Sequence, residues 1–260
     1  MNMPRVALAR ISCAAILLSA ASGCFEVKQT IKVKKDMSGT AAFDFKMDLE
    51  PMVYMMAFMQ KAMSGGGDNP TITKSDLAKA RKEFLANQGD DFKEKVGNRK
   101  EIESNLPPGV KIKKFKSNSN GTKMSVDALF AFDKVTQLNA LDMKNAGESP
   151  VSGLKVEETA TTLTILTTID NPTKSAGGAM GPMGGAGGSP EDMPGPMGDV
   201  MRKALNAMKF NIVIEAPFKV KEHNATSKRG NKLTWTIDYK RMKAAEKTGD
   251  LLDVRVVYLK

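Results

Sequence analysis

The sequence has few of the residues on which many active sites depend. Its 260 residues include one histidine, two cysteines and one tryptophan, and aromatic residues make up 6%. Most metal sites and most histidine-based proton transfers need several converging ligands or a histidine with a partner, so a single histidine excludes most designs of both kinds. Hydrophobic residues at 41% and charged residues at 26% are close to the average for soluble globular proteins, which disfavours wholesale disorder and a multi-span membrane protein.

The N-terminal segment has the composition of an export signal. Residues 1–10 carry Arg5 and Arg10 and no acidic residue, and residues 11–21 are apolar except for two serines. An apolar stretch of this length is too short to cross a bilayer as a helix. A basic segment followed by such a stretch is typical of a signal peptide that is removed from the mature protein.

The signal ends in Ala21-Ser22-Gly23-Cys24, which resembles the lipobox of bacterial lipoproteins, although Ala21 stands where leucine is usual. The resemblance implies cleavage before Cys24, a diacylglycerol on its sulfur and usually an acylated amine. Two or three acyl chains hold a protein stably on a membrane. We therefore expect residues 1–23 to be a signal peptide and Cys24 to be the sole anchor. The alternative is an ordinary secretory signal cleaved near Gly23, with an incidental cysteine.

This processing determines the thiols and the charge of the mature chain. Cys13 leaves with the signal and Cys24 becomes a thioether, which excludes a disulfide framework, thiol catalysis and cysteine-based zinc sites. Loss of Arg5 and Arg10 leaves 37 basic against 29 acidic residues, a net charge of +8. That excess fits contact with anionic lipid headgroups or a solvated surface equally well.

Alternation of apolar and polar residues predicts strands. It runs through residues 25–34 and 41–48 on either side of the turn Asp36–Gly39, so a β-hairpin should begin directly at the anchor. The other predicted strands are 110–116, 124–132, 154–156, 163–169, 210–220 (kinked at Pro217), 232–239 and 252–259.

Helices are predicted between these strands. Pro51 and methionines at helical spacing predict a helix over 51–63. Thr73-x-x-Asp76 is typical of a capping box, a second helix should begin at Asp90, and Pro107-Pro108-Gly109 should end it. Shorter helices are predicted over 133–143 and 199–207.

These elements indicate one α+β domain over residues 24–260, in which an antiparallel β-sheet packs against amphipathic helices. Residues 173–198 are rich in glycine, methionine and proline. Because few of their side chains can bury apolar area, we expect a long flexible loop that interrupts the domain and has no core of its own.

A second resemblance lies in the C-terminal third and in the first hairpin. Its segments are Cys24 with the strand after it, Asp36-x-Ser38-Gly39, Phe210–Ile214, Ala216-Pro217, Lys219-Val220, Asn224 and Gly230–Trp235. The pattern is similar to LppM-type bacterial lipoproteins; the middle of the chain is unassigned. The resemblance implies binding of an envelope lipid or glycolipid but identifies no ligand-binding residue. Such relatives usually carry a C-terminal transmembrane helix, which is missing from this chain.

The methionine-rich run over residues 52–59 has three interpretations. Its side chains can form core, a deformable groove for a lipid or partner, or thioether ligands for copper. An apolar surface all round the helix requires cover on more than one side, so the outer residues are the candidate ligand contacts. The candidates are Met52, Met55, Met56 and Met59.

No other motif indicates catalysis, a cofactor or a metal. The glycine-rich tract 177–188 lacks the lysine of a phosphate-binding loop, and the adjacent acids Asp90-Asp91 and Glu157-Glu158 are best read as solvated surface. The lysines of 111–116 could suggest nucleic acid, but an exported protein rarely meets it.

The sequence therefore favours a non-enzymatic lipoprotein of the cell envelope that binds lipid, glycolipid or another envelope component. The alternative is a structural or assembly lipoprotein that docks a protein partner, and an enzyme is the least favoured class. Because Phe25 rather than aspartate follows Cys24, the outer membrane is the expected location in a bacterium with two membranes.

Overall fold

The computed structural model describes residues 24–66, 70–97, 99–104, 106–141, 151–169, 195–248 and 252–260. Strands and helices alternate in blocks along these residues. The strands are β1 (Cys24–Val33), β2 (Gly39–Asp48), β3 (Val110–Asn120), β4 (Lys123–Phe132), β5 (Val151–Glu158), β6 (Thr162–Ile169), β7 (Lys209–Glu215), β8 (Lys219–His223), β9 (Ser227–Arg229), β10 (Lys232–Asp238) and β11 (Leu252–Leu259). The helices are α2 (Glu50–Lys61), the turn η1 (Ala62–Gly66), α3 (Lys74–Gly97), α4 (Arg99–Ser104), η2 (Val135–Leu141), α6 (Gly195–Ala207) and α7 (Tyr239–Thr248).

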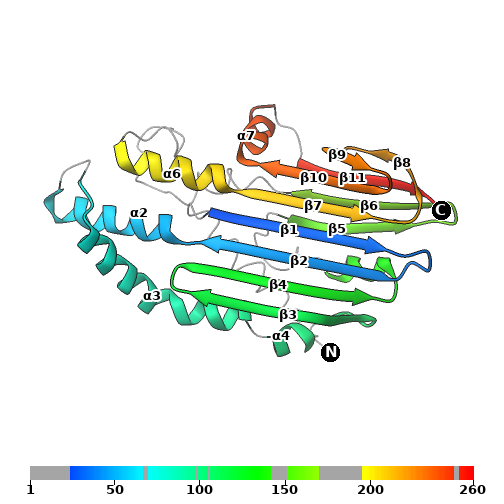
Figure 1. Cartoon of the computed structure of the whole chain (residues 1–260), viewed down its shortest axis with the longest axis horizontal. Coiled ribbons are helices and arrows are strands. Elements are labelled where there is room, and N and C mark those ends of the chain that lie inside the picture. The colour runs from blue at the N-terminus through cyan, green and yellow to red at the C-terminus, as the bar shows by residue number, and fades with distance from the viewer. Residues whose placement is uncertain are drawn as a thin grey trace, which may run out of the picture.

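A seven-stranded sheet forms the body of the molecule, in the order β3-β4-β2-β1-β7-β10-β9 (Figure 1). The expected hairpin β1–β2 is present, and β3 and β4, which were expected as strands, form a second hairpin. The two hairpins lie side by side because β2 pairs with β4. The first strand also pairs with β7, and that pair is parallel, unlike its neighbours. The large sheet thus pairs the first described strand with a strand from the C-terminal third of the sequence.

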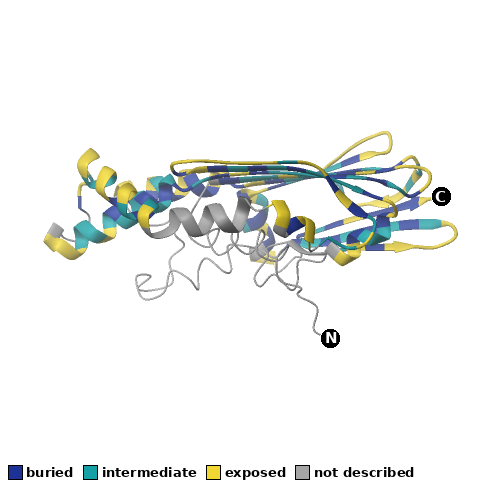
Figure 2. Ribbon diagram, turned by 90° about the horizontal axis from the view of Figure 1, so that it is seen from below, coloured by how far each residue is buried: buried dark blue, intermediate teal, exposed yellow. Residues whose placement is uncertain are grey.

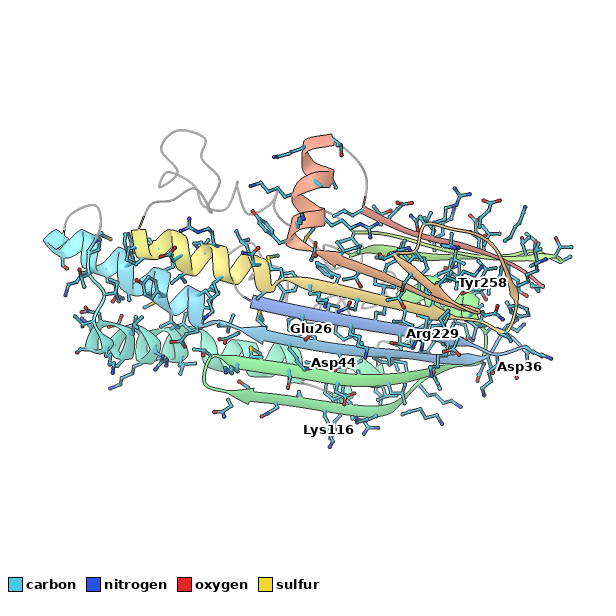
Figure 3. All side chains as sticks on the ribbon, turned by 45° about the horizontal axis from the view of Figure 1, so that its top comes forward. Glu26, Asp36, Asp44, Lys116, Arg229 and Tyr258 are labelled. Atoms are coloured by element: carbon cyan, nitrogen blue, oxygen red, sulfur yellow. The ribbon has the colours of Figure 1, made fainter. Side chains whose placement is uncertain are left out.

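Strand alternation gives this sheet one apolar and one polar face. Side chains from Phe25, Phe45, Val126 and Trp235 are buried on the inner face. The outer face carries alternating acids, lysines and threonines, among them Glu26, Asp44 and Lys116 (Figure 3). The period-two pattern of the sequence therefore corresponds to a sheet with one solvated face.

A second sheet, β5-β6-β11-β8, forms a separate layer against the inner face (Figure 2). The expected continuous strand over 210–220 is wrong: the chain leaves the large sheet after Glu215 and enters the small one at Lys219. The kink at Pro217 is thus a change of sheet, and Ala216 beside it is buried in the core. The Tyr258 hydroxyl lies 3.4 Å from the carbonyl oxygen of Ile214, so the two layers touch there.

Helices α2, α3 and α6 gather at the end of the large sheet where β1 begins (Figure 1). The capping box is confirmed: the Asp76 amide donates to Thr73 Oγ1 at 3.2 Å, and the Thr73 amide donates to Asp76 Oδ2 at 2.9 Å. The separate helix expected from Asp90 is wrong, because α3 runs through that residue to Gly97. The glycine before Asp90 does not end the helix, because a glycine inside a helix costs only about 1 kcal/mol of stability. Contacts with α2 and β3 stabilise α3.

Two other helix boundaries differ from expectation. Helix α6 begins at Gly195 rather than residue 199, because Met197 and Gly198 are buried against the core. Helix α7 was not expected, although Tyr239, Met242 and Ala245 recur at helical spacing and are buried.

The α+β class is confirmed, with two sheets in place of the single sheet that was expected. The expected loop 173–198 loses its last four residues to α6. Its remainder, like the expected signal peptide 1–23, lies outside the described residues. Among the described helices, none is long and apolar enough to cross a membrane.

Candidate functional site

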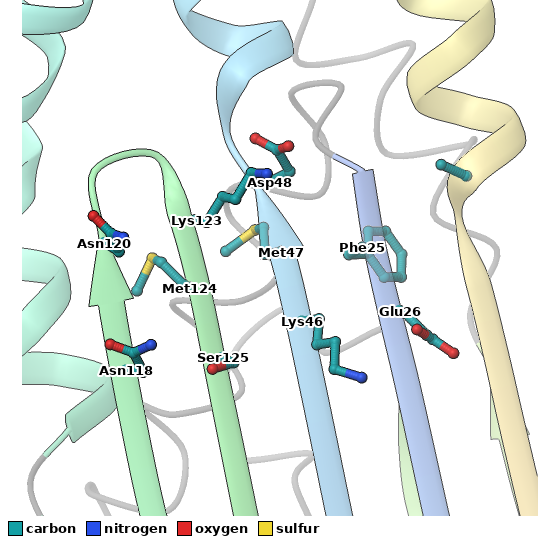
Figure 4. Close-up of a pocket in the computed structure, with 11 residues that line it drawn as sticks. Phe25, Glu26, Lys46, Met47, Asp48, Asn118, Asn120, Lys123, Met124 and Ser125 are labelled. Carbon is teal, nitrogen blue, oxygen red and sulfur yellow. The ribbon is translucent and has the colours of Figure 1, made fainter.

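A hollow of about 530 Å³ lies at the end of the large sheet where β1 begins (Figure 4). Strands β1 to β4 contribute most of its lining, and the end of α6 closes one side. The lining residues are Phe25, Glu26, Lys46, Met47, Asp48, Asn118, Asn120, Lys123, Met124, Ser125 and Ala207.

The register of the four strands brings the polar lining residues together in two rows. The first row, from β3 to β2, consists of Asn120, Lys123 and Asp48, and the second, from β3 to β1, of Asn118, Ser125, Lys46 and Glu26. Cys24 of β1 is the register partner of Asp48. Neighbouring strands lie about 4.8 Å apart, so the second row spans about 14 Å and the first about 10 Å, and the rows are about 7 Å apart.

Buried apolar residues form the base of this array. Phe25, Met47 and Met124 alternate with the polar residues along their strands and belong to the core. The ring of Phe25 meets that of Phe210 edge-on, with centroids 5.1 Å apart. The polar residues therefore project from a packed sheet, which fixes their backbone positions before any ligand binds.

Some polar groups of the site already have partners in the protein. Lys46 Nζ lies 3.7 Å from Asp44 Oδ1, and both side chains are largely exposed. Asp48 Oδ1 accepts the amide proton of Glu50, the first residue of α2, at 3.0 Å. Lys123 and the two asparagines of β3 are exposed.

The array suits recognition of an anionic or hydroxylated group. Ammonium groups bind phosphate oxygens by charge-assisted hydrogen bonds, and amides and carboxylates bind sugar hydroxyls. The described residues contain no group of three or more histidine, cysteine, aspartate or glutamate side chains that could hold a metal ion.

Hydrogen bonds fix the helices at the edge of the hollow. The hydroxyl of Thr122 donates to Glu50 Oε2 at 3.0 Å, and Glu50 also forms an ion pair with Arg81 of α3. The Leu49 amide donates to the Thr122 carbonyl at 2.8 Å. Arg81 donates the hydrogen bond to Glu50, and this bond together with the negative charge of Glu50 raises the pKa of the Arg81 guanidinium. The turn between β3 and β4 is thus joined to α2 and α3.

The methionines of α2 that the sequence singled out are not among the residues that line the hollow. Cys24 is the first residue of β1 and pairs in register with Asp48. In α2 the buried residues are Pro51, Val53 and Ala57, so the methionines flank the buried stripe instead of forming it. Met52 and Met56 pack against the core while partly exposed, Met55 is half-buried and Met59 is exposed.

Sequence reasoning missed the polar array itself. Alternation predicts Glu26 and Lys46 on the polar side of the first hairpin, whereas Asn118 and Asn120 lie in a stretch that the sequence predicts as a turn. The first hairpin places Glu26 opposite Lys46, but Asn118 and Ser125 reach them only because β3 continues to Asn120 and β2 pairs with β4, from which three helices separate it in the sequence. No local signal predicts that pairing.

No protein-family model matches the sequence, and no curated protein matches it. Among solved structures, the chain is similar to the NMR structure of the folded domain of the Mycobacterium tuberculosis LppM protein. The identity is 9%, the TM-score is 0.43, and the match covers 91% of this chain and 90% of that domain.

Proposed function

We propose that the protein is an envelope lipoprotein, anchored through acylated Cys24, that binds the headgroup of a lipid or glycolipid in the hollow without catalysing a reaction. The observation that carries the proposal is the register of Cys24 with Asp48, a residue that lines the hollow. Acyl chains on Cys24 would bring the hollow to the level of the headgroups. A bound lipid could then keep its tails in the bilayer.

The chemistry of the array supports a headgroup as ligand. Lys46 and Lys123 lie on neighbouring strands, one row apart, and can approach one phosphate from two sides. Asn118, Asn120 and Ser125 supply uncharged donors and acceptors for hydroxyl groups. The carboxylates of Glu26 and Asp48 would favour polyhydroxylated or zwitterionic headgroups over a bare polyanion.

The anchor is tested by Cys24→Ser, which removes the acylated sulfur. We expect the variant to leave the membrane fraction for the soluble fraction, while the unmodified protein stays with the membrane after a high-salt wash. The expected membrane is the outer one in a bacterium with two membranes, which sucrose-gradient separation checks. Retention of the Cys24→Ser variant on washed membranes would contradict anchoring through this residue.

Headgroup binding is tested by native mass spectrometry of the detergent-extracted protein. The double variant Lys46→Gln/Lys123→Gln removes two charge-assisted hydrogen bonds of about 1.5–3 kcal/mol each, so retention of a co-purified lipid should fall about a hundredfold or more. The control Lys228→Gln/Lys232→Gln loses the same charge from β9 and β10, far from the hollow. Equal lipid retention in both double variants would contradict the proposed site.

The alternative of a protein partner docked on a sheet edge has less support. The exposed edge strand β3 carries Lys111, Lys113 and Lys116 on a segment with an irregular register between Ile112 and Lys114. Strand β5, an edge of the small sheet, is also irregular, between Ser152 and Lys155. Lysines and bulges are devices that oppose pairing with another strand.

A further inference from the structure

We propose that the helical tip, defined as the end of α2, the turn η1 and the first turns of α3, rests on the membrane and inserts Met59 and Met63 at the boundary between headgroups and acyl chains. This inference rests on the proposed anchoring through Cys24. It adds a second membrane contact and an orientation for the whole domain.

The position of the anchor supports a membrane-bound tip. Strand structure begins at Cys24 itself, so no tether separates the acylated residue from the sheet. Helix α2 begins at Glu50, two residues after the register partner of Cys24, and runs away from the sheet (Figure 1). Its twelve residues extend about 18 Å past that point.

Because no flexible linker separates Cys24 from the sheet, the anchor restricts the orientation of the domain on the bilayer. If the long axis were perpendicular to the membrane with Cys24 at the surface and the helices toward the bilayer, α2 with its charged residues would project about 18 Å into the bilayer. The domain must therefore lie with its long axis inclined toward the membrane plane, and the helical tip then contacts the headgroups.

The tip presents the apolar side chains that such a contact needs. Among the described residues the exposed large hydrophobic side chains are Met63 at 87%, Met59 at 36% and Leu259, and Leu259 lies at the opposite end of the molecule. Met59 and Met63 are four residues apart, on the same side of a helical turn. Methionine side chains are flexible and can adapt to an irregular lipid surface.

The charges at the tip favour an anionic membrane. Lys61 Nζ lies 3.3 Å from Asp76 Oδ2, and Gln60 donates to Glu83 at 2.7 Å, so both acids have partners within the tip. Lys74, Lys79 and Lys82 of α3 are exposed. Exposed lysines beside an apolar patch strengthen attachment to anionic lipid.

The test uses the lipidated full-length protein reconstituted into vesicles of dioleoyl phosphatidylcholine and phosphatidylglycerol. Met63→Cys introduces the only free thiol of the lipidated protein, because Cys13 leaves with the signal peptide and Cys24 is acylated. This thiol is labelled with an environment-sensitive fluorophore. The control is Lys35→Cys, an exposed residue in the turn between β1 and β2 at the far end of β1. Both sites are exposed, so neither substitution should alter folding, which thermal melting verifies.

We expect the label at Met63 to shift its emission to shorter wavelength and to be quenched by nitroxide-bearing lipids several-fold more than the label at Lys35. Flotation of the vesicles separately reports anchoring. If the protein floats with the vesicles but both labels are quenched equally and weakly, the proposed contact of the tip with the membrane is refuted and the anchoring through Cys24 still stands. A floating protein whose Met63 label is shielded but not quenched shows that a second copy covers the tip and also overturns it. A protein that does not float refutes the anchoring and this inference together.

Discussion

Asn224 is the residue whose removal tests most sharply how the two sheets are joined. Its Oδ1 accepts the indole proton of Trp235 at 2.7 Å and the amide proton of Arg255 at 2.8 Å. Its Nδ2 donates to the carbonyl oxygen of Asp253 at 3.1 Å. One side chain thus connects β10 of the large sheet to β11 of the small one.

Asn224→Ala should leave the indole N–H of Trp235 without this acceptor inside the core, where Trp235 is 0% exposed. An unsatisfied buried donor costs about 1–3 kcal/mol, and the Arg255 amide can recover part of its bond from water because Asn224 itself is exposed. We expect a loss of about 2–3 kcal/mol. For a domain of this size that lowers Tm by about 4–10 °C.

Trp235 is the only tryptophan in the chain, so its fluorescence reports urea unfolding directly, with circular dichroism as the second probe. The matched control is Asn231→Ala, in the exposed turn between β9 and β10, which should change the free energy of unfolding by about 0.5 kcal/mol or less. A loss from Asn224→Ala no larger than that of the control, with an unchanged emission maximum, would refute this reasoning.

Three other perturbations follow from described contacts. Gly39→Ala should destabilise by about 1–3 kcal/mol, measured by urea unfolding, because its Cβ would lie 2.0 Å from a backbone oxygen of β1. Hydrogen bonds from the Thr73 backbone and hydroxyl lower the pKa of Asp76, so this group stabilises the fold above its unfolded pKa, and the stabilisation is lost as pH falls through the folded pKa. Thr73→Ala should therefore flatten the acid side of the stability profile, and an unchanged profile would contradict it. Replacing 173–194 by a short glycine-serine linker should leave Tm within a few degrees, whereas extending the deletion through the buried Met197 should lower it clearly.

Local features of the sequence were enough to predict much of the secondary structure. The hairpin from Phe25 to Met47 follows from alternation and a turn, and the helix start at Thr73 follows from a capping box whose two bonds depend only on nearby residues. Such signals act within a few residues. They predict that an element forms, but they do not predict which other elements it packs against.

The features that position the site depend on distant pairings. The parallel pairing of β1 with β7 joins Val27 to Phe210, and nothing near either residue indicates the other. Pro217 was visible as a break, but the change of sheet depends on the pairing of Lys219 and Val220 with β11, which lies elsewhere in the sequence. The polar array around Lys123 was missed for the same reason.

The most direct test of headgroup binding is photo-crosslinking in intact cells. A photoactivatable amino acid in place of Ser125 would sit in the second polar row of the hollow, and the same residue in place of Thr234 would sit on the same outer face of the large sheet, on β10. We expect irradiation to attach a lipid or glycolipid mass at position 125 and none at position 234, as read by mass spectrometry of the purified protein. A protein-sized adduct at position 125, or equal adducts at both positions, would contradict a lipid-binding site in the hollow.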